Sequence, residues 1–324
     1  MPKKNPYKNI KSHTFGKAIS YKWLYIIGIS ILVMLLPVQN GYALRSIFET
    51  YETQTELVPP IPASVPVDLH ISSPPDLSAE AIAITDVGSN VRMYQKNANA
   101  RLYPASITKI MTALVAQEAY RLEEVVTVEK LTDEGQVMGL KPNESITVEN
   151  LLYGILVHSA NDAAYVLAAH YPRGVAGFVQ RMNEKAFELN LKDTHFANPS
   201  GLDDPENYST ASDISTLSIF ALKNPVISKI VSVPQITVSD INFVTFHNLK
   251  NVNELLGKIP GVSGFKTGFT QTAGQSLVTT VQRNNHKIII VVLKSTDRFK
   301  ETEELVTWVF PNFAWQELGP KEMK

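Results

Sequence analysis

Apolar and polar positions alternate with two different periods along the chain, and from residue 79 onward they predict a mixed α and β domain. Two short apolar runs at 79–84 and 91–94 flank a turn at 88–90, the pattern of a β-hairpin. Helical spacing dominates the middle of the chain to about residue 225. The predicted helices there are 104–120, 150–157, 161–169 and 175–189, followed by strands at 264–267, 275–281 and 287–293 and a helix at 300–310. Strands on both sides of a helical block predict one sheet built from distant segments.

A long apolar run near the N-terminus follows a basic flank. Residues 1–22 hold six lysines and no acid, and residues 23–44 carry no charged side chain. As a helix with a rise of about 1.5 Å per residue, such a run is long enough to span the ~30 Å hydrocarbon core of a bilayer. The lysines indicate that this end stays in the cytoplasm. We therefore expect residues 1–43 to be a signal or membrane-anchor segment, and the remainder to be exported.

Two fates of this segment are compatible with the sequence. Gly41, Tyr42 and Ala43 resemble the small-residue site that is cut in signal peptides. The lysine-rich flank is long, however, and the apolar run is at the upper end of signal lengths, which favours a retained anchor. In both cases the rest of the chain is exported to the outer face of the cytoplasmic membrane, either anchored at its N-terminus or released by cleavage.

Prolines separate the apolar segment from the predicted domain. Residues 44–78 lack apolar periodicity and contain Pro59, Pro60, Pro62, Pro66, Pro74 and Pro75. Proline-rich chain favours extended polyproline II, which acts as a semi-rigid spacer. The sequence thus predicts a linker at 44–78, a folded domain at 79–315 and a short tail at 316–324.

Composition and charge exclude several classes of function. The 324 residues include no cysteine, so a disulfide framework, a zinc–thiolate site and a cysteine nucleophile are excluded together. The whole chain carries 30 positive and 31 negative side chains, but six lysines and no acid lie in residues 1–43, so the exported part has a formal charge of −7. This balance disfavours a nucleic-acid partner. His158, His170 and His195 are isolated in the sequence, so we expect no metal site and no cofactor.

Ser106 and Lys109 are the first pair with catalytic chemistry. They lie three residues apart on a predicted helix, so their side chains share one face. A serine hydroxyl is a weak nucleophile, and a desolvated lysine beside it can act as its base. Ser263 and Lys266 have the same spacing, but on a predicted strand, where residues three apart point to opposite faces. We therefore discard Ser263 as a nucleophile.

Two further short motifs follow in the chain. Ser159, Ala160 and Asn161 lie between two predicted helices and present a hydroxyl and an amide at a bend, although serine and asparagine are also ordinary helix caps. Lys266, Thr267 and Gly268 open a predicted strand, where glycine permits close approach of a backbone or ligand. Each motif alone is weak. In this order, the three motifs form the serine-acylation signature of β-lactamases and penicillin-binding proteins.

The chain resembles a D-alanyl-D-alanine carboxypeptidase of the low-molecular-mass penicillin-binding protein family. The resemblance covers residues 79–312 and extends well beyond the three motifs. It is carried by the segments 104–113, 151–164, 196–202, 208–213 and 260–270. It implies an α/β (α+β) fold of the β-lactamase/transpeptidase type, in which an antiparallel sheet is flanked by helices and joined by a helical subdomain. The active-site groove would lie between the two parts.

The resemblance also implies a role for each motif residue. Ser106 would attack the carbonyl of the penultimate D-alanine, and Lys109 would take its proton. Ser159 would relay a proton to the leaving D-alanine, and Asn161 would hold the donor peptide. Lys266, Thr267 and Gly268 would bind the terminal carboxylate, as suits a fixed cation and a hydroxyl. The backbone N–H groups of Ser106 and Phe269 would form the oxyanion hole.

Departures from the family pattern are few. Ala160 stands where relatives most often have glycine, and Ser200 stands in a segment where relatives commonly have histidine after Asn–Pro. Arg298, before the final helix, is a weaker candidate for carboxylate binding that we leave out of the predicted site. Asp162 and Asp213 are interpreted as acids at helix starts, with Thr210 and Asp213 as a capping box.

Three functions are compatible with these motifs. The first is a serine-type D-Ala-D-Ala carboxypeptidase that acts on peptidoglycan stem peptides and is inhibited covalently by β-lactams. The second is a DD-endopeptidase that cuts peptide cross-links. The third is a penicillin-binding sensor or scaffold that is acylated without turnover. A β-lactamase is disfavoured, because we find no glutamate placed to activate a deacylating water.

Overall fold

The structure is a computed structural model that describes residues 25–29 and 64–317. Residues 25–29 are helical and form part of the predicted targeting segment. The remainder of that segment, the linker residues 44–63 and the tail residues 318–324 lie outside the described residues. Within the described residues, no single helix is both long and apolar enough to cross a membrane, whereas one sharply bent pair of helices, residues 211–222 and 225–231, meets the criterion jointly.

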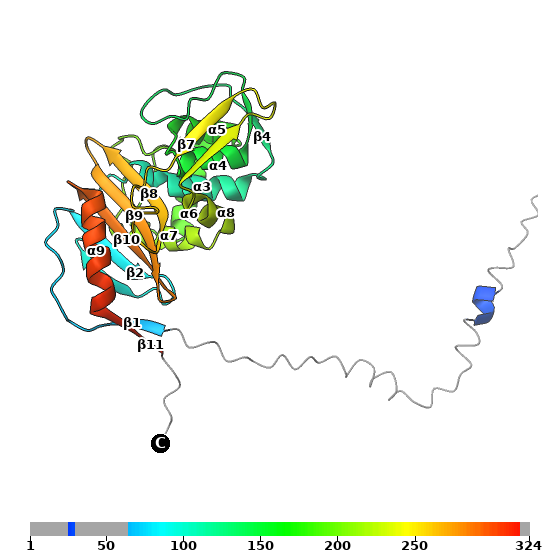
Figure 1. Cartoon of the computed structure of the whole chain (residues 1–324). Coiled ribbons are helices and arrows are strands. Elements are labelled where there is room, and N and C mark those ends of the chain that lie inside the picture. Colours follow the sequence, from blue (N-terminus) through cyan, green and yellow to red (C-terminus); the bar gives the residue numbers. More distant parts are fainter. Residues whose placement is uncertain (1–24, 30–63, 318–324) are drawn as a thin grey trace, which may run out of the picture. The chain divides into compact units, whose positions relative to one another are not determined.

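A five-stranded antiparallel sheet forms one half of the region 64–317 (Figure 1). Its order is β3–β2–β10–β9–β8, so strands from both ends of the chain share one sheet, as predicted. The strands are β2 (Ala81–Asp86), β3 (Arg92–Lys96), β8 (Val262–Thr270), β9 (Gly274–Arg283) and β10 (His286–Ser295). All six residues of β2 are buried, because helices cover both faces of the sheet.

The two faces of the sheet bury separate cores. Helix α9 (Arg298–Asn312) packs on one face, where Leu305, Val306 and Val309 join Ile288 and Ile290 of β10. Helix α7 (Ala211–Leu222) packs on the opposite face, toward the helical half of the molecule. Alternation along β10 sends successive apolar residues to opposite cores, which explains its continuous buried run.

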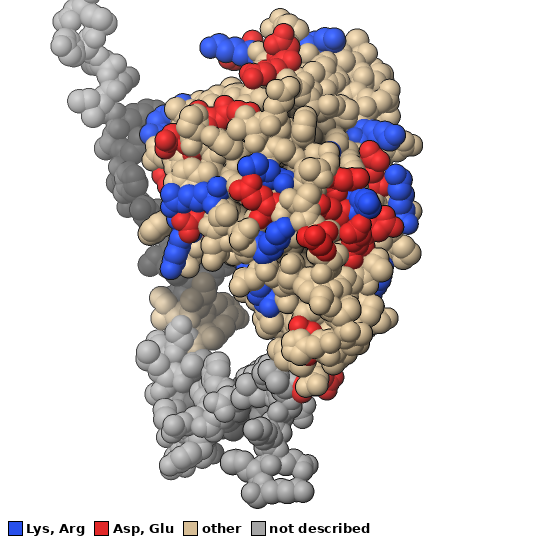
Figure 2. Space-filling model, turned by 90° about the vertical axis from the view of Figure 1, so that its left-hand side faces the viewer, with Lys and Arg blue, Asp and Glu red and all other residues tan. Residues whose placement is uncertain are grey.

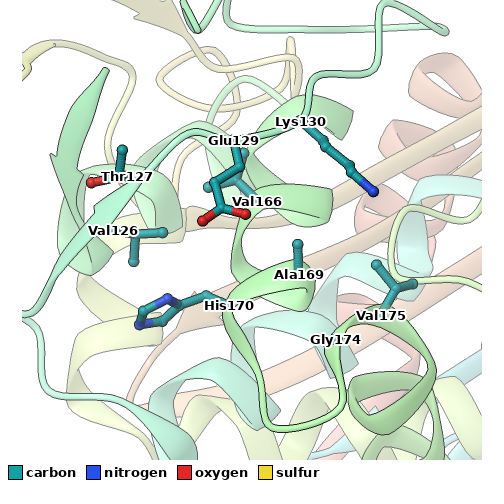
Figure 3. A pocket seen from close by; sticks show the side chains of 9 residues that line it. All are labelled: Val126, Thr127, Glu129, Lys130, Val166, Ala169, His170, Gly174 and Val175. Carbon is teal, nitrogen blue, oxygen red and sulfur yellow. The ribbon is translucent and has the colours of Figure 1, made fainter. Parts of the chain in front are cut away.

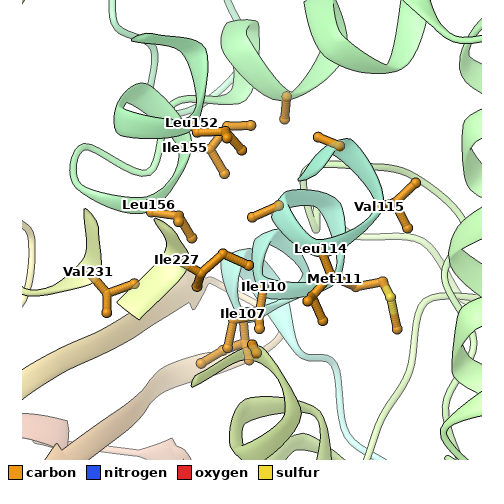
Figure 4. Close-up of a cluster of buried hydrophobic side chains, with 14 of the residues drawn as sticks. Ile107, Ile110, Met111, Leu114, Val115, Leu152, Ile155, Leu156, Ile227 and Val231 are labelled. Carbon is orange, nitrogen blue, oxygen red and sulfur yellow. The ribbon is translucent and has the colours of Figure 1, made fainter. Parts of the chain in front are cut away.

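The helical half is organised around the segment that carries Ser106. A short 3₁₀ turn, η1 (Ala105–Thr108), continues into α3 (Lys109–Ala119), and both are enclosed by the surrounding helices. Figure 4 shows Ile107, Ile110 and Leu114 facing apolar side chains of α4 and α8. The surrounding helices are α4 (Val148–Leu156), α5 (Asn161–His170), α6 (Gly174–Glu188) and α8 (Pro225–Val231). Tight packing on all sides fixes the direction of side chains on this buried helix.

Most predicted elements are confirmed, with one boundary corrected. The sequence placed the start of the domain at residue 79 and a tail from residue 316. Instead, β1 (Ser64–Asp68) pairs antiparallel with β11 (Phe313–Glu317), so residues 64–78 and 316–317 belong to the folded region. Pro66 lacks a backbone N–H, and a two-stranded ribbon tolerates it because one edge needs no donor.

Two small ribbons extend from the helical half. They are β4 (Val125–Thr127) with β5 (Ser145–Thr147), and β6 (Gln235–Ser239) with β7 (Phe246–Lys250). Neither was predicted, because their strands are only three to five residues long. On the face shown in Figure 2, acidic and basic side chains are interspersed.

Candidate active site

Backbone geometry presents Ser106 at the start of the buried helix. Ala105, the preceding residue, has a φ of +47°, which is strained for a side chain other than glycine. Gly201 packs directly on this turn with a φ of +83°, and a Cβ there would lie 1.8 Å from the carbonyl oxygen of Ala105. Only glycine fits such an approach. The turn that carries Ser106 is thus held against the segment that contains Gly201.

Lys109 is completely buried and makes three hydrogen bonds. Its Nζ donates to Ser106 Oγ at 2.9 Å, to Asn161 Oδ1 at 2.6 Å and to the backbone oxygen of Ser200 at 2.7 Å. The contact between Ser106 and Lys109 follows from their spacing on one helical face. Ser200 and Asn161 come from distant parts of the chain, so the tertiary fold completes the environment of the amine.

Ser159 and Asn161 lie where α4 ends and α5 begins. Ser159 adopts a φ of +63°, and this bend turns its hydroxyl toward β8. Asn161 is the first residue of α5, and both its backbone and its side chain are held by the loop before β5: its N–H donates to the oxygen of Gln136 and its Nδ2 to the oxygen of Glu134. The amide oxygen of Asn161 is thereby oriented toward Lys109.

Strand β8 supplies the third motif at the terminal position of the sheet. Lys266 Nζ donates to Ser159 Oγ at 2.8 Å and to the oxygen of Thr267 at 3.0 Å. Gly268 approaches the start of the nucleophile turn so closely that a Cβ would lie 2.9 Å from the oxygen of Pro104. Phe269 is 60% exposed, at the open side of the strand. Hydrogen bonds from Lys109 to Ser106 and Asn161, and from Lys266 to Ser159, thus join the three motifs.

Burial changes the protonation of both lysines. Desolvation lowers the pKa of Lys109 from its usual 10.5 to about 7, against a smaller opposing effect of Asp162. Desolvation also holds the pKa of Lys266 well below its usual range, and the positive charges of Lys109 and Arg298 act in the same direction. A lysine with a pKa near 7 can exchange a proton at neutral pH, as a general base must.

Arg298 belongs to the site, although the sequence prediction left it out. Its Nη1 donates to the oxygen of Gly268 at 2.7 Å, and burial lowers the pKa of its guanidinium. Arg298 is the first residue of α9 and lies 30 positions from Gly268. The signal in the sequence was its place shortly after β10, a strand of the sheet that also holds the third motif.

The other polar candidates have structural partners. Asp162 lies in the first turn of α5, as predicted, but it mainly holds a loop, because it accepts hydrogen bonds from the backbone N–H groups of Met138, Gly139 and Leu140 as well as from that of Ala163. Thr210 caps α7 by accepting from the N–H of Asp213. Ser263 pairs with Thr280 on the neighbouring strand, away from Lys266. In the described part of the chain, no group of three or more His, Asp or Glu side chains is arranged to hold a metal ion.

A hollow elsewhere in the helical half involves none of the motif residues. Figure 3 shows Glu129, Val166 and His170 around this cavity of about 370 Å³, which is framed by β4 and α5. His170, one of the isolated histidines, bonds Glu124 at 2.9 Å. Without a nucleophile or a buried base, this cavity has no catalytic chemistry comparable to that around Ser106.

Comparison with known proteins connects this geometry to a family. The family model for D-alanyl-D-alanine carboxypeptidases, peptidase S11, matches residues 69–297. The D-alanyl-D-alanine carboxypeptidase DacA of Haemophilus influenzae is 32% identical over 259 residues, which are 74% of this chain and 64% of the relative. The D-alanyl-D-alanine endopeptidase of Escherichia coli is 31% identical over 252 residues, which are 74% of this chain and 79% of the relative.

Solved structures agree with the sequence comparison. The crystal structure of the Streptomyces K15 DD-transpeptidase superposes with a TM-score of 0.70 at 29% identity, covering 74% of this chain and 100% of the neighbour. The predicted fold of the penicillin-binding protein type is therefore confirmed. The chain spans about three fifths of the length of the first curated carboxypeptidases that it matches.

Proposed function

The chain belongs to the D-alanyl-D-alanine carboxypeptidase family, and we propose that it removes the terminal D-alanine from peptidoglycan stem peptides through an acyl-enzyme on Ser106. The observation that carries this proposal is the buried amine of Lys109, 2.9 Å from Ser106 Oγ, with a pKa of about 7. A base with this pKa is populated in its neutral form at neutral pH, beside the hydroxyl that it must activate.

The three partners of Lys109 determine which way its lone pair points. A neutral amine keeps two N–H groups, and the oxygens of Asn161 and Ser200 can only accept hydrogen bonds. Ser106 Oγ is the one partner that can also donate. When Lys109 loses its proton, the two carbonyl oxygens hold its two N–H groups, and the lone pair faces the serine hydroxyl. This arrangement makes Lys109 the base for acylation.

Acylation forms one bond and breaks another at the same carbonyl carbon. Ser106 Oγ forms a bond to the carbonyl carbon of the penultimate D-alanine, and its proton passes to Lys109. The bond from that carbon to the nitrogen of the terminal D-alanine breaks, and the proton taken up by Lys109 passes by way of Ser159 to the leaving nitrogen, which leaves Lys109 neutral again. The N–H groups of Ser106 and Phe269 stabilise the oxyanion, and each such donor is worth about 10²–10³ in rate. Water then hydrolyses the ester.

The opposite side of the groove supplies the recognition of the substrate. In this proposal, the ammonium of Lys266 and the hydroxyl of Thr267 bind the terminal carboxylate, with Arg298 as the next cation along the strand. Asn161 holds the donor peptide, and Gly268, which has no side chain, allows the backbone of this peptide to come close to β8. The pKa of Lys266 is depressed because its buried ammonium lacks a negatively charged partner. An arriving carboxylate would supply this partner, so the depressed pKa fits a role in binding the carboxylate.

We also propose that the enzyme acts outside the cytoplasm, with residues 1–43 as a signal or an anchor. The basic flank and the uncharged run of residues 23–44 support this placement. N-terminal sequencing of protein extracted from membranes separates the two fates. A chain that starts at Leu44 would exclude the retained anchor, whereas an intact N-terminus would support it.

Covalent trapping by benzylpenicillin tests the nucleophile. The expected result is one adduct per chain on the wild type, seen by intact mass, and none on Ser106→Ala. Ser263→Ala is the matched control, because Ser263 shares the spacing to a lysine but bonds Thr280, and it should be acylated like the wild type. An adduct that survives Ser106→Ala would overturn the assignment. Release of D-alanine from a stem pentapeptide then tests the hydrolysis.

Endopeptidase activity is the second candidate. Two curated DD-endopeptidases are 31% and 30% identical to the chain, which covers 79% and 83% of them, but it also covers 76% and 78% of two curated carboxypeptidases, so coverage does not separate the two activities. A cross-linked peptide dimer and a monomeric pentapeptide should therefore be assayed side by side. Faster cleavage of the dimer would favour the endopeptidase. A stable adduct without hydrolysis of either peptide would indicate a penicillin-binding sensor.

A further inference from the structure

The hairpin β6–β7 carries a cluster of exposed apolar side chains at its tip. Residues 64–317 include eleven large apolar side chains that are exposed, and four of them lie within six positions. These four are Ile241, Phe243, Val244 and Phe246, with exposed fractions of 42%, 73%, 79% and 59%. Single exposed apolar residues are ordinary, whereas a contiguous group marks a surface that contacts something other than water. We call residues 241–246 the hairpin tip.

The surface of the hairpin tip carries no charge. Residues 241–246 contain no Asp, Glu, Lys, Arg or His. The two flanking titratable residues, Asp240 and His247, are only 6% and 4% exposed. In the interior, His247 bonds a carboxylate oxygen of Glu144 at 2.7 Å and the backbone oxygen of Met138 at 3.1 Å. The tip therefore offers no charge to a ligand of opposite sign and nothing that opposes its entry into an apolar medium.

Hydrogen bonds within the protein already satisfy the backbone of the hairpin tip. The carboxylate of Asp240 accepts hydrogen bonds from three backbone N–H groups, and its backbone oxygen accepts a fourth. The four donors are the N–H groups of Asn242, Val244, Thr245 and Phe243. The remaining N–H group in the range 241–245, that of Ile241, donates to the oxygen of Ser145 in β5. No backbone donor in this range would have to be stripped of water without a replacement.

A satisfied backbone distinguishes between kinds of partner. A protein that added a strand to the tip would need free backbone donors, and residues 241–245 offer none. A bilayer makes the opposite demand, because its apolar layer offers no hydrogen-bond partner to a backbone group that enters it. Phe243 has a φ of +57°, which is strained for a bulky residue, and in this conformation it is 73% exposed. The tip is thus a small apolar wedge that suits a lipid interface.

The linker is long enough to let the hairpin tip reach the membrane. Residues 23–44 form the predicted membrane segment, and the 19 residues 45–63 separate them from β1. At about 3.3 Å per residue, a chain of this length reaches up to about 60 Å. β1 and β7 lie at opposite ends of the folded region (Figure 1), and a compact region of about 250 residues is roughly 45 Å across. A chain that is anchored in the bilayer can therefore still place its hairpin tip on the same bilayer.

We propose that the hairpin tip is a second membrane contact, with Phe243 and Val244 entering the lipid interface and Ile241 and Phe246 supporting them, so that the folded region is held in one orientation on the membrane. The inference rests on the retained anchor of the proposed function. A small apolar tip binds a bilayer weakly by itself, and the anchor supplies the high local concentration of membrane that makes a weak contact sufficient.

Fluorescence quenching by labelled lipids tests this contact in the full chain. The chain has no cysteine, so Val244→Cys provides a single attachment site for an environment-sensitive fluorophore. Phe187→Cys is the matched control, because Phe187 is 86% exposed and is the only one of the eleven exposed apolar residues between positions 132 and 240. Both labelled chains are inserted into vesicles of phosphatidylethanolamine and phosphatidylglycerol, some of which carry a nitroxide on the acyl chain. We expect the nitroxide to quench the probe at position 244 several-fold more than the probe at position 187.

A charge at the hairpin tip separates its contribution from that of the anchor. Phe243→Asp, added to the labelled Val244→Cys chain, should reduce quenching to the level seen at position 187, because a carboxylate is costly in the apolar layer. The same chain should still float with the vesicles, because the anchor is unchanged. Phe187→Asp in place of Phe243→Asp should leave the quenching at position 244 as it was. Equal Tm values show that each variant is folded.

The remaining outcomes contradict the inference in distinguishable ways. Equal quenching at positions 187 and 244 in chains that float, or quenching at 244 that survives Phe243→Asp, would overturn the lipid contact and leave the anchor in place. A probe at 244 that becomes shielded without lipid as the protein concentration rises would show that the tip binds a second copy of the chain instead. A chain that does not float would refute the anchor and the tip contact together. Release of D-alanine is measured without vesicles, so its absence reports on the catalytic proposal alone.

Discussion

The pH dependence of acylation is the most direct test of the buried base. At its ordinary pKa of about 10.5, only about one Lys109 in three thousand would be neutral at pH 7. With a pKa of about 7, about half of the molecules carry the neutral amine. Burial therefore increases the population of the active base by about a thousand-fold at neutral pH. The corresponding shift is worth about 5 kcal/mol, of which desolvation is the largest cause.

The acylation rate should follow the neutral fraction of Lys109. We expect the second-order rate constant for benzylpenicillin to rise ten-fold per pH unit below about pH 6, and to reach a plateau above about pH 8. At pH 5 the neutral fraction is about 1%, so the rate there should be about a hundred-fold below the plateau. The assay is the appearance of the covalent adduct under pseudo-first-order conditions between pH 5 and 9.

Two variants identify which group titrates. Lys109→Arg keeps a positive charge but cannot lose its proton at these pH values, so acylation should fall by about 10²–10⁴ without a rising limb. Lys266→Gln should be slower at every pH but should keep the rising limb, because Lys109 still titrates. A wild-type rate that is flat between pH 5 and 9, or a rising limb that disappears in Lys266→Gln alone, would refute the assignment of Lys109 as the base.

Three other predictions concern the fold around the site. Between pH 7 and 10.5 the unfolded wild type binds a proton at Lys109 that the folded wild type does not, so the stability of the wild type rises with pH. The stability of Lys109→Met lacks this dependence. Measured by urea denaturation, the stability of Lys109→Met relative to the wild type should therefore be about 2 kcal/mol greater at pH 7 than at pH 9. Gly201→Ala should lower Tm by several degrees and acylation by about a hundred-fold, because its Cβ collides with the oxygen of Ala105 and displaces the nucleophile. A chain that begins at residue 76 should be about 2 kcal/mol less stable than one that begins at residue 62, because it loses β1 and leaves β11 without its partner; equal Tm values for the two chains would show that the ribbon contributes nothing.

The sequence predicted those parts of the site that depend on local periodicity. Ser106 and Lys109 meet because of their spacing on one helical face, and Ser263 points away from Lys266 because of strand alternation. Strands on both sides of a helical block predicted one sheet built from distant segments, but not the order of its strands. For the two Ser–Lys pairs, a short segment of chain contains all the geometric information.

Contacts between distant segments account for what the sequence did not predict. Arg298 reaches Gly268 only because the first turn of α9 lies against the end of β8 and β9, and no local pattern specifies that packing. The same holds for the carbonyl oxygens of Glu134 and Gln136, which orient Asn161 from a loop without periodicity. The β1–β11 ribbon joins the two ends of the folded region. Its first strand was assigned to the linker because it contains Pro66, and proline is unusual within a strand.

The two buried lysines have little negative charge around them. An isolated buried ammonium is costly, and here Lys109 and Lys266 lie close enough for the charge of the first to lower the pKa of the second. The nearest carboxylate that affects Lys109 is Asp162, but four backbone N–H groups already occupy its oxygens, so its compensation is partial. A carboxylate moved into contact with Lys109 would stabilise the fold and would also raise the pKa of the base, removing it from the neutral range. The two amines are therefore short of negative charge in the structure, and in the proposed function the substrate carboxylate would supply that charge at Lys266 when it binds.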